Sequence, residues 1–313
     1  MLSVIVRRLL FAIPVLFITS IVTFILQALI PGDAARTIVG TGGTPEAYEH
    51  VREQLHLNLP LWQQYAIYIG GVFRGDLGTS LFTGEPVAQT IAQRLPVTLT
   101  VVIGATLVAG LIGVLLGAAS ARFRGPLAKL VDVISLAGSA LPNFWLGLVL
   151  VSTFSIALPL LPATGFVPFS DSPSGWLASI VLPVVALAVA GIAQIAKTAR
   201  DGISDALQRD YIRTLRAAKV SEGALLWRHA LKNSGVSIVT VVGLGFVGAL
   251  AGSIFVENVF ALPGLGALVD TATNQHDIPV IQGVALAYAL IVIAVNLVVD
   301  LSYSLLNTKV RVR

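Results

Sequence analysis

The 313-residue sequence contains no cysteine, a single methionine and few charged residues. Without cysteine the chain can form neither disulfide bonds nor thiolate metal sites. It also lacks the GxxxxGK[ST] loop that cradles nucleotide phosphates and the HExxH and GxSxG motifs of two hydrolase classes. The four histidines, which show no metal-ligand spacing, are His50, His56, His229 and His276. These absences leave the sequence without a recognisable catalytic or nucleotide-binding motif.

Charged residues make up only 12% of the chain, whereas hydrophobic residues make up 56% and the mean hydropathy is +0.87. A net charge of +4 could suggest a nucleic-acid partner, but the basic residues lie between long apolar runs. About 20 apolar residues suffice to cross a bilayer as a helix. The composition therefore predicts an all-α integral membrane protein.

Six apolar runs are long enough to be transmembrane helices. The first follows Arg7-Arg8 and is too long for the hydrophobic region of a secretory signal, so we interpret it as retained. The third is charge-free over 133–170, and its prolines predict a helix to about Leu158 followed by a structured apolar loop. The predicted spans are 9–30, 96–121, 133–158, 172–196, 233–256 and 278–299. The pairs Gly113/Gly117 and Gly248/Gly252 predict close helix packing, either within this subunit or against a second one.

A polar segment, 31–94, separates the first two spans. Thr44-Pro45-Glu46 is typical of a helix start, and we expect that helix to run to about His56. A second helix is predicted from near Pro60, with aromatic residues suited to a membrane interface. Residues 87–95 are typical of an amphipathic elbow before the second span.

Six spans place both termini on the same side of the membrane. Of the 20 Lys and Arg residues, 16 fall in the termini and even-numbered loops and 4 on the other side, so the termini are predicted to be cytoplasmic. We expect three regions. They are residues 1–30, the N-terminus with the first span; residues 31–95, an extracytoplasmic loop domain; and residues 96–313, a core with five spans and a cytoplasmic loop at 197–233.

The loop 197–233 holds eight of the 20 basic residues. As a helix, its first half separates basic from apolar side chains on opposite stripes. Ser221 is suited to cap a second helix, with Glu222 in its first turn, so we predict two short amphipathic helices joined at 219–221. The basic stripe comprises Arg209, Arg213, Arg216 and Lys219, and the apolar stripe comprises Leu207, Tyr211, Leu215 and Ala218.

Residues 210–217 (DYIRTLRA) and 228–233 (RHALKN) resemble the cytoplasmic EAA loop of bacterial ABC-importer permeases, in the variant of peptide-type members. Four further segments are similar to the dipeptide/oligopeptide permease subunit with a long first external loop, so the resemblance covers the whole chain. These segments are 29–33 (LIPGD), 75–80 (GDLGTS), 141–145 (LPNFW) and 257–266 (ENVFALPGLG). Lys219 and Val220 stand where the family has Gly and Leu. The missing glycine disfavours a tight left-handed turn, and a kink at Val220-Ser221 is the alternative.

The resemblance implies a type I ABC-importer permease of the bacterial cell membrane, with six transmembrane helices and cytoplasmic termini. It implies a heterodimer of two permeases, joined by two cytoplasmic ATPase subunits and an extracytoplasmic solute-binding protein. The chain would bind no cofactor itself, and ATP and Mg would be used by the ATPase subunits. Di- and oligopeptides are the expected substrates, with glutathione or nickel chelates as alternatives within the family.

A transport chain without a nucleotide site must receive energy by contact, and a short projecting helix can fit a groove on an ATPase and move with it. We expect residues 210–221 to be this coupling helix, with Tyr211 and Leu215 as buried anchors and Arg213 and Arg216 at the rim. A solvated basic loop near anionic lipid is the alternative. The predicted ATPase-coupling residues are Asp210, Tyr211, Arg213, Thr214, Leu215, Arg216, Ala217, Lys219 and Ser221.

Polar residues inside apolar spans are candidates for the substrate pathway. Hydrogen bonding between helices is the alternative for the amides, and an interfacial position is the alternative for Asp300. Glu257 and Asn258, at the outer end of the fifth span, are candidates for an outer gate or a binding-protein contact. The candidate pathway residues are Asn143, Phe144, Trp145, Gln194 and Asn296.

Two functions of other classes remain as alternatives. An ATP-independent channel or carrier would not need two amphipathic cytoplasmic helices, and such proteins more often show internal repeats, which this sequence does not. A membrane enzyme lacks support because no hydrolase motif or cluster of intramembrane acids is present.

Overall fold

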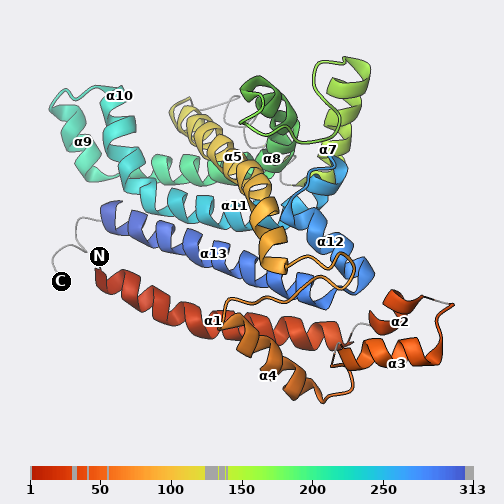
Figure 1. Cartoon of the computed structure of the whole chain (residues 1–313). Coiled ribbons are helices and arrows are strands. Elements are labelled where there is room, and N and C mark those ends of the chain that lie inside the picture. Colours follow the sequence, from red (N-terminus) through yellow and green to blue (C-terminus); the bar gives the residue numbers. More distant parts are fainter. Residues whose placement is uncertain are drawn as a thin grey trace. The chain divides into compact units, whose positions relative to one another are not determined.

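The computed structural model describes residues 2–29, 34–40, 42–54, 56–123, 133, 138 and 140–306, and in these ranges the chain is helical with connecting turns (Figure 1). In this part of the chain, five helices are long and apolar enough to cross a membrane. They are α1 (Leu2–Leu29), α5 (Val87–Arg122), α8 (Pro173–Leu207), α11 (Leu231–Val259) and α13 (Ile278–Leu306). The prediction of an all-helical membrane protein is confirmed.

A shorter apolar helix falls in the third predicted span. It comprises α7 (Asn143–Val151) and a π-helical continuation, η1 (Ser152–Ala157), so it ends where the prolines predicted. Half of the predicted span before Asn143, residues 134–137 and 139, lies outside the described residues. The described part of the chain thus contains five long apolar helices and this shorter one.

Most of the long helices extend beyond their apolar runs, for example α13, which continues past the predicted end at Val299 to Leu306. The predicted elbow at 87–95 is wrong as a separate element, because α5 begins at Val87 and continues through Pro96. Likewise α8 continues past the predicted end at Ala196 to Leu207. Ala199, Ile203 and Ala206 stay buried at helical spacing beyond that end, so packing continues where the charge-free run stops.

The short helices outside the spans follow local start signals. Thr44 Oγ1 accepts a hydrogen bond from Ala47 N at 3.3 Å and caps α3 (Pro45–Gln54), which ends two residues before the predicted His56. Pro60 precedes α4 (Leu61–Val72) as predicted. The remaining short helices are α2 (Ala34–Val39), α9 (Asp210–Ala217), α10 (Glu222–Ala224) with the π-helical η2 (Leu225–Ala230), and α12 (Leu265–Gln275).

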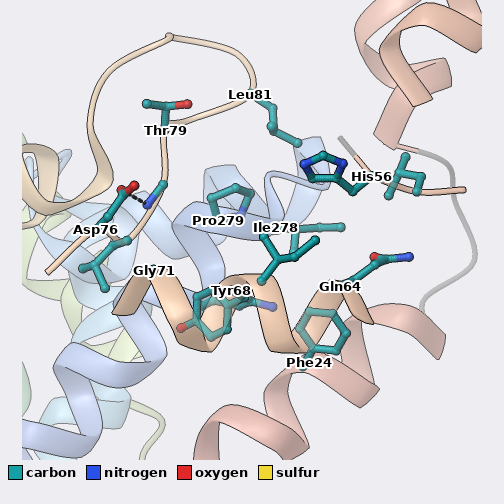
Figure 2. Close-up of a pocket in the computed structure, with 15 residues that line it drawn as sticks. Phe24, His56, Gln64, Tyr68, Gly71, Asp76, Thr79, Leu81, Ile278 and Pro279 are labelled. Carbon is teal, nitrogen blue, oxygen red and sulfur yellow. Dashed lines mark hydrogen bonds between the residues drawn. The ribbon is translucent and has the colours of Figure 1, made fainter. Parts of the chain in front are cut away.

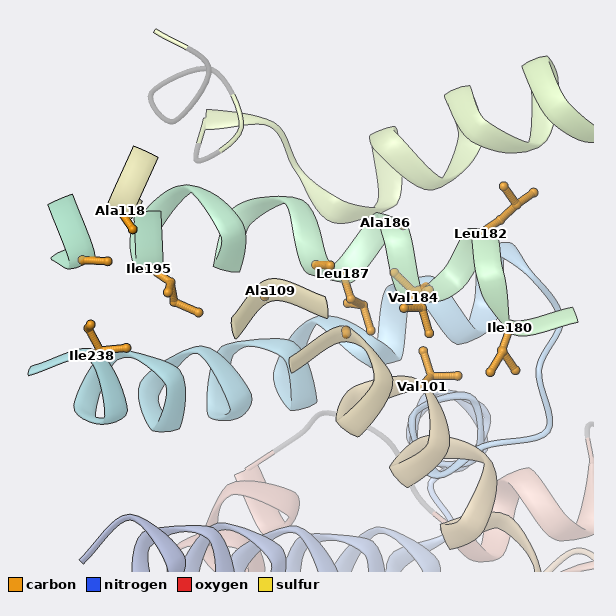
Figure 3. Packing of buried hydrophobic residues seen from close by; sticks show 14 of the residues in the cluster. Val101, Ala109, Ala118, Ile180, Leu182, Val184, Ala186, Leu187, Ile195 and Ile238 are labelled. Carbon is orange, nitrogen blue, oxygen red and sulfur yellow. The ribbon is translucent and has the colours of Figure 1, made fainter. Parts of the chain in front are cut away.

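The chain forms two compact units. Unit 1 comprises residues 1–4, 97–262 and 295–313, and unit 2 comprises residues 5–96 and 263–294. In unit 1, α8 and α11 lie side by side and α7 packs on both. Figure 3 shows part of this core, where Val101 and Ala109 of α5 lie among side chains of α8 such as Val184 and Leu187.

Glycines set the closeness of helix packing in unit 1. A Cβ at Gly117 would lie 2.6 Å from the backbone oxygen of Ala196, and one at Gly113 would lie 2.8 Å from Ile195. The first glycine pair therefore packs against α8 within this chain. In the second pair, a Cβ at Gly252 would meet Asn143, whereas nothing in the described structure lies within 4 Å of one at Gly248.

Unit 2 joins part of α1, the segment containing α2 to α4, the first turns of α5, α12 and most of α13. Its buried apolar cluster is Val87, Ile91, Leu265, Ala272, Val280 and Val284. The hydroxyls of Ser20 and Tyr65 are 2.8 Å apart, and the ring of Phe24 meets that of Tyr65 edge-on at 5.4 Å. Aromatic side chains of α4 thus hold it against α1.

Candidate functional site

The loop between α8 and α11 carries α9, the predicted coupling helix. Ile212 is fully buried and ties α9 to unit 1. Its neighbour Tyr211 is 40% exposed, and Leu215 is half-buried. The helix is therefore fixed to its own chain by Ile212, a residue that we did not predict, while Tyr211 presents part of its ring outward.

A left-handed turn ends α9. Lys219 has φ +59°, and its backbone N–H donates to the oxygen of Arg216 at 3.0 Å while Val220 N–H donates to Leu215 at 3.1 Å. These two bonds form a Schellman motif, which satisfies carbonyls at the helix end. The left-handed conformation costs a residue with a side chain about 1 kcal/mol, and the bonds offset it. The prediction that a lysine disfavours this turn, with a kink at Val220-Ser221 instead, is wrong.

Ser221 caps the next helix as predicted, since its hydroxyl accepts from Ala224 N–H at 3.3 Å. Across the turn, Arg216 pairs with Glu222 through two bonds of 2.6 Å and 3.1 Å. The helix that starts at Glu222 is not a short separate one, because α10 and η2 continue without a break into α11. The loop thus contains one short helix and the extended start of a span.

The polar residues of α9 bond locally. Arg213 pairs with Asp210 at 3.3 Å, and the hydroxyl of Thr214 donates to the backbone oxygen of Asp210 at 3.3 Å. Ala217 is the last residue of α9. The first residue of each predicted stripe lies outside α9: Leu207 of the apolar stripe ends α8, and Arg209 of the basic stripe precedes α9. The two stripes therefore do not belong to one continuous helix.

The predicted pathway residues lie on several helices. Asn143 begins α7 and is half-buried against Gly252 of α11, while Phe144 and Trp145 are 45% and 46% exposed. Gln194 and Asn296 are also exposed. Among the described residues no hydrogen bond joins these three amides, so the structure of this single chain does not bring them together.

Glu257 lies in the interior of unit 1. Its exposed fraction is 0%, and its Oε1 accepts a hydrogen bond of 2.7 Å from the hydroxyl of Thr98 on α5. Its carboxylate is therefore not presented to a binding protein in this conformation. Asn258 is exposed, and its amide donates to the backbone oxygen of Ile254 at 3.1 Å.

Burial of Glu257 follows from the way α11 ends. Ala261 has φ +47°, and Leu262 N–H donates to the oxygen of Glu257 at 2.8 Å. This second Schellman turn folds the chain back, so that Phe260 and Leu262 are each 1% exposed. Sequence reasoning missed Thr98, although a threonine early in a charge-free span is a signal for a buried partner.

The motif at 75–80 is structural in unit 2. Asp76 Oδ1 accepts from Gly78 N–H at 2.8 Å. Ser80 donates to Oδ2 of Asp277 at 2.5 Å, and Leu81 N–H donates to its Oδ1 at 3.3 Å. Asp277 is 2% exposed and directly precedes α13, so these bonds fix the loop to the start of that helix.

Beside this motif, unit 2 contains a hollow of about 330 Å³ (Figure 2). Phe24, Gln64 and Tyr68 line it together with Asp76. The hydroxyl of Tyr68 is buried and has no hydrogen-bond partner among the described residues, and burial raises the pKa of this phenol. The hydroxyl therefore stays protonated at neutral pH.

Comparison with known proteins identifies the class. Residues 109–312 match the family of binding-protein-dependent transport system inner membrane components, and residues 1–102 match the N-terminal part of such membrane components. The chain belongs to this family. It is a multi-pass permease subunit of the bacterial inner membrane, and this class of transport system works with a binding protein and ATPase subunits.

Named relatives match along their full length. The chain is 40% identical over 313 residues to a protein named as a peptide transport system permease in Brucella abortus (strain 2308), covering 99% of each. It is 38% identical over 312 residues to the glutathione transport system permease protein GsiC of Escherichia coli O6:H1, covering 99% of each. It is 37% identical over 332 residues to the dipeptide transport system permease protein DppB of Alkalihalophilus pseudofirmus, covering 99% of this chain and 100% of that one.

A solved structure shares the fold. The crystal structure of an amino acid ABC transporter with histidines superposes with a TM-score of 0.51 at 18% identity, covering 68% of this chain and 92% of that one. At this identity the likeness supports the fold alone.

Proposed function

We propose that this chain is a translocation subunit of an ATP-driven importer of di- and oligopeptides. It would cross the membrane six times in the type I arrangement, with both termini in the cytoplasm. It would pair with a second permease, with two cytoplasmic ATPases and with an extracytoplasmic solute-binding protein. This orientation is supported by the distribution of the basic residues, of which 16 lie on the predicted cytoplasmic side and 4 on the other side.

The observation that carries the coupling role is the geometry of α9. The helix is anchored by buried Ile212 and ended by the Lys219 turn, while Tyr211 stays 40% exposed. A rigidly held helix with an outward aromatic side chain suits docking into a groove, where it would transmit ATPase movement to α8 and α11. The chain itself would bind no cofactor, with ATP and Mg bound by the ATPases.

Peptides are the favoured substrates because two of the relatives compared above are named for peptide or dipeptide transport. A peptide backbone needs hydrogen-bond partners but no fixed charge. Exposed Gln194 and Asn296 on membrane helices provide such partners, since a polar side chain in a span tends to face a cavity or another protein. Glutathione is a second candidate, because the GsiC relative is named for it.

Leu215→Asp tests the coupling role. The charge would prevent Leu215 from packing in the ATPase groove, so transport-coupled ATP hydrolysis should be abolished while membrane insertion is intact. The measurement is ATP hydrolysis and uptake by the complete transporter in reconstituted vesicles. Gly223→Asp is the matched control, because a Cβ there meets nothing within 4 Å in the described structure. Unchanged coupling in the Leu215 variant would contradict the docking role.

Uptake measurements test the substrate. Cells with and without this chain are given labelled dipeptides, oligopeptides, glutathione and nickel chelates. Loss of peptide uptake alone supports the peptide assignment, and loss of glutathione or nickel uptake alone replaces it. If no ATPase subunit co-purifies with the chain, an ATP-independent carrier becomes the better interpretation.

A further inference from the structure

A hollow of about 390 Å³ lies in unit 1 beside α9 and the start of α11. Tyr211 of α9 lines it together with three basic or proton-accepting side chains, Arg228, His229 and Lys232. Val236 and Leu306, from the apolar parts of α11 and α13, complete it on another side. The hollow thus combines a cluster of nitrogen donors with an apolar wall.

The donors in this hollow are not neutralised by the protein. Among the described residues, Arg228, His229 and Lys232 form no ion pair or hydrogen bond through their side chains. Three of the four acids of the same loop are paired elsewhere, Asp201 with Arg200, Asp210 with Arg213 and Glu222 with Arg216. The fourth, Asp205, does not line the hollow. The hollow is therefore suited to an external anion.

The position of the hollow along α11 indicates the membrane surface. The charge-free run of α11 starts directly after Lys232, and the preceding turn carries Trp227, which is 48% exposed. Tryptophan and basic residues at the start of a span are typical of the level of the lipid headgroups. At that level, Val236 and Leu306 would meet the start of the acyl chains and the cations would meet the phosphate.

We propose that this hollow binds the phosphate of an anionic phospholipid in the cytoplasmic leaflet. The proposal rests on the orientation given under Proposed function. A lipid fits better than an acidic side chain of an ATPase, because a docked protein side chain would leave the apolar wall of Val236 and Leu306 unused. Since Tyr211 contributes to the hollow, the bound headgroup would link α9 to α11.

The fluorescence of Trp227 provides a local probe. The complete transporter carries Phe in place of Trp62, Trp145 and Trp176, and is placed in phosphatidylcholine nanodiscs containing a minor share of brominated lipid. Brominated phosphatidylglycerol should quench Trp227 more strongly than brominated phosphatidylcholine. The double variant R228Q/K232Q should lose this preference, by roughly fivefold in relative binding constant for each charge removed.

The control removes two basic residues outside the hollow, K197Q/R209Q, and should retain the preference. The proposal would be overturned if both brominated lipids quench the parent protein equally, or if both double variants lose the preference for phosphatidylglycerol to the same extent. Either result would indicate a general attraction between the basic loop and anionic lipids and not a specific site. Displacement by inorganic phosphate at constant ionic strength would identify a soluble anion instead. Quenching is measured with and without the ATPases. A preference seen only without them would show that the ATPase occupies the hollow, whereas ATPases that fail to bind would count against the coupling role alone.

Discussion

The helices α9 and α11 end in the same backbone motif but in opposite surroundings. In each, a residue with a side chain adopts the left-handed conformation, Lys219 at φ +59° and Ala261 at φ +47°. In each, the following N–H closes the turn, from Val220 to Leu215 and from Leu262 to Glu257. Neither turn uses the glycine that most often occupies this position.

The difference lies in what surrounds the two turns. The turn after α9 is polar and exposed, and the Arg216–Glu222 pair crosses it with both side chains about half exposed. At the turn after α11, Ala261 itself is exposed, but Glu257, Phe260 and Leu262 around it are buried, and Glu257 receives a hydrogen bond from Thr98. The same local geometry therefore presents a surface in one place and closes a packed interior in the other.

The largest expected effect follows from removing the buried carboxylate beside the turn after α11. Glu257→Ala removes the acceptor of the Thr98 hydroxyl and leaves a cavity, which should destabilise unit 1 by about 4 kcal/mol. Thermal unfolding of the purified transporter would show this as a lower apparent Tm. Glu257→Gln keeps an acceptor oxygen and is the control. An unchanged Tm in the alanine variant would show that the bond between Thr98 and Glu257 does not stabilise unit 1.

A smaller effect is expected from releasing α9. Ile212→Ala should lower the free energy of unfolding by about 2–3 kcal/mol. It should also lower coupled ATP hydrolysis, because α9 loses its anchor. Tyr211→Ala should lower the Tm much less than Ile212→Ala and mainly reduce coupling, since Tyr211 is 40% exposed whereas Ile212 is fully buried. Both quantities are measured on the same vesicles. If Tyr211→Ala lowers the Tm as much as Ile212→Ala, the division between anchor and docking surface is incorrect.

The smallest effect concerns the turns themselves. Lys219→Gly and Ala261→Gly relieve the left-handed strain, so each should leave stability within about 1 kcal/mol of the parent. Lys219→Pro is the contrasting change, because proline fixes φ near −65° and lacks the N–H that bonds to Arg216. If Lys219→Pro leaves coupling intact, the left-handed turn is not required for docking.

Local signals in the sequence predicted much of the fold. Charge-free runs predicted the long helices because only hydrogen-bonded helices can carry their backbone through lipid. Thr44 and Ser221 each cap a helix through a bond to a nearby backbone N–H, as short-range chemistry allows. The assignment of 210–217 to a helix followed in the same way from its amphipathic spacing.

Other features depend on contacts between distant segments. The continuation of α8 to Leu207 depends on the burial of Ala199, Ile203 and Ala206 against other helices. Gly113 and Gly117 pack on α8. The sequence could not predict this partner, because two glycines four residues apart favour close packing against any helix. The candidate pathway amides Asn143, Gln194 and Asn296 lie on three different helices, α7, α8 and α13, and among the described residues no hydrogen bond joins them.

The sequence by itself thus determined the membrane class, the family and the position of the short helix at 210–217, because composition, charge asymmetry and motifs are properties of the chain alone. Only the tertiary structure decided that Lys219 turns left-handed, that Ile212 anchors α9 and that Glu257 faces inward. Each of these depends on the balance between local strain or desolvation and contacts made far along the chain. Such contacts exist only once the helices have packed.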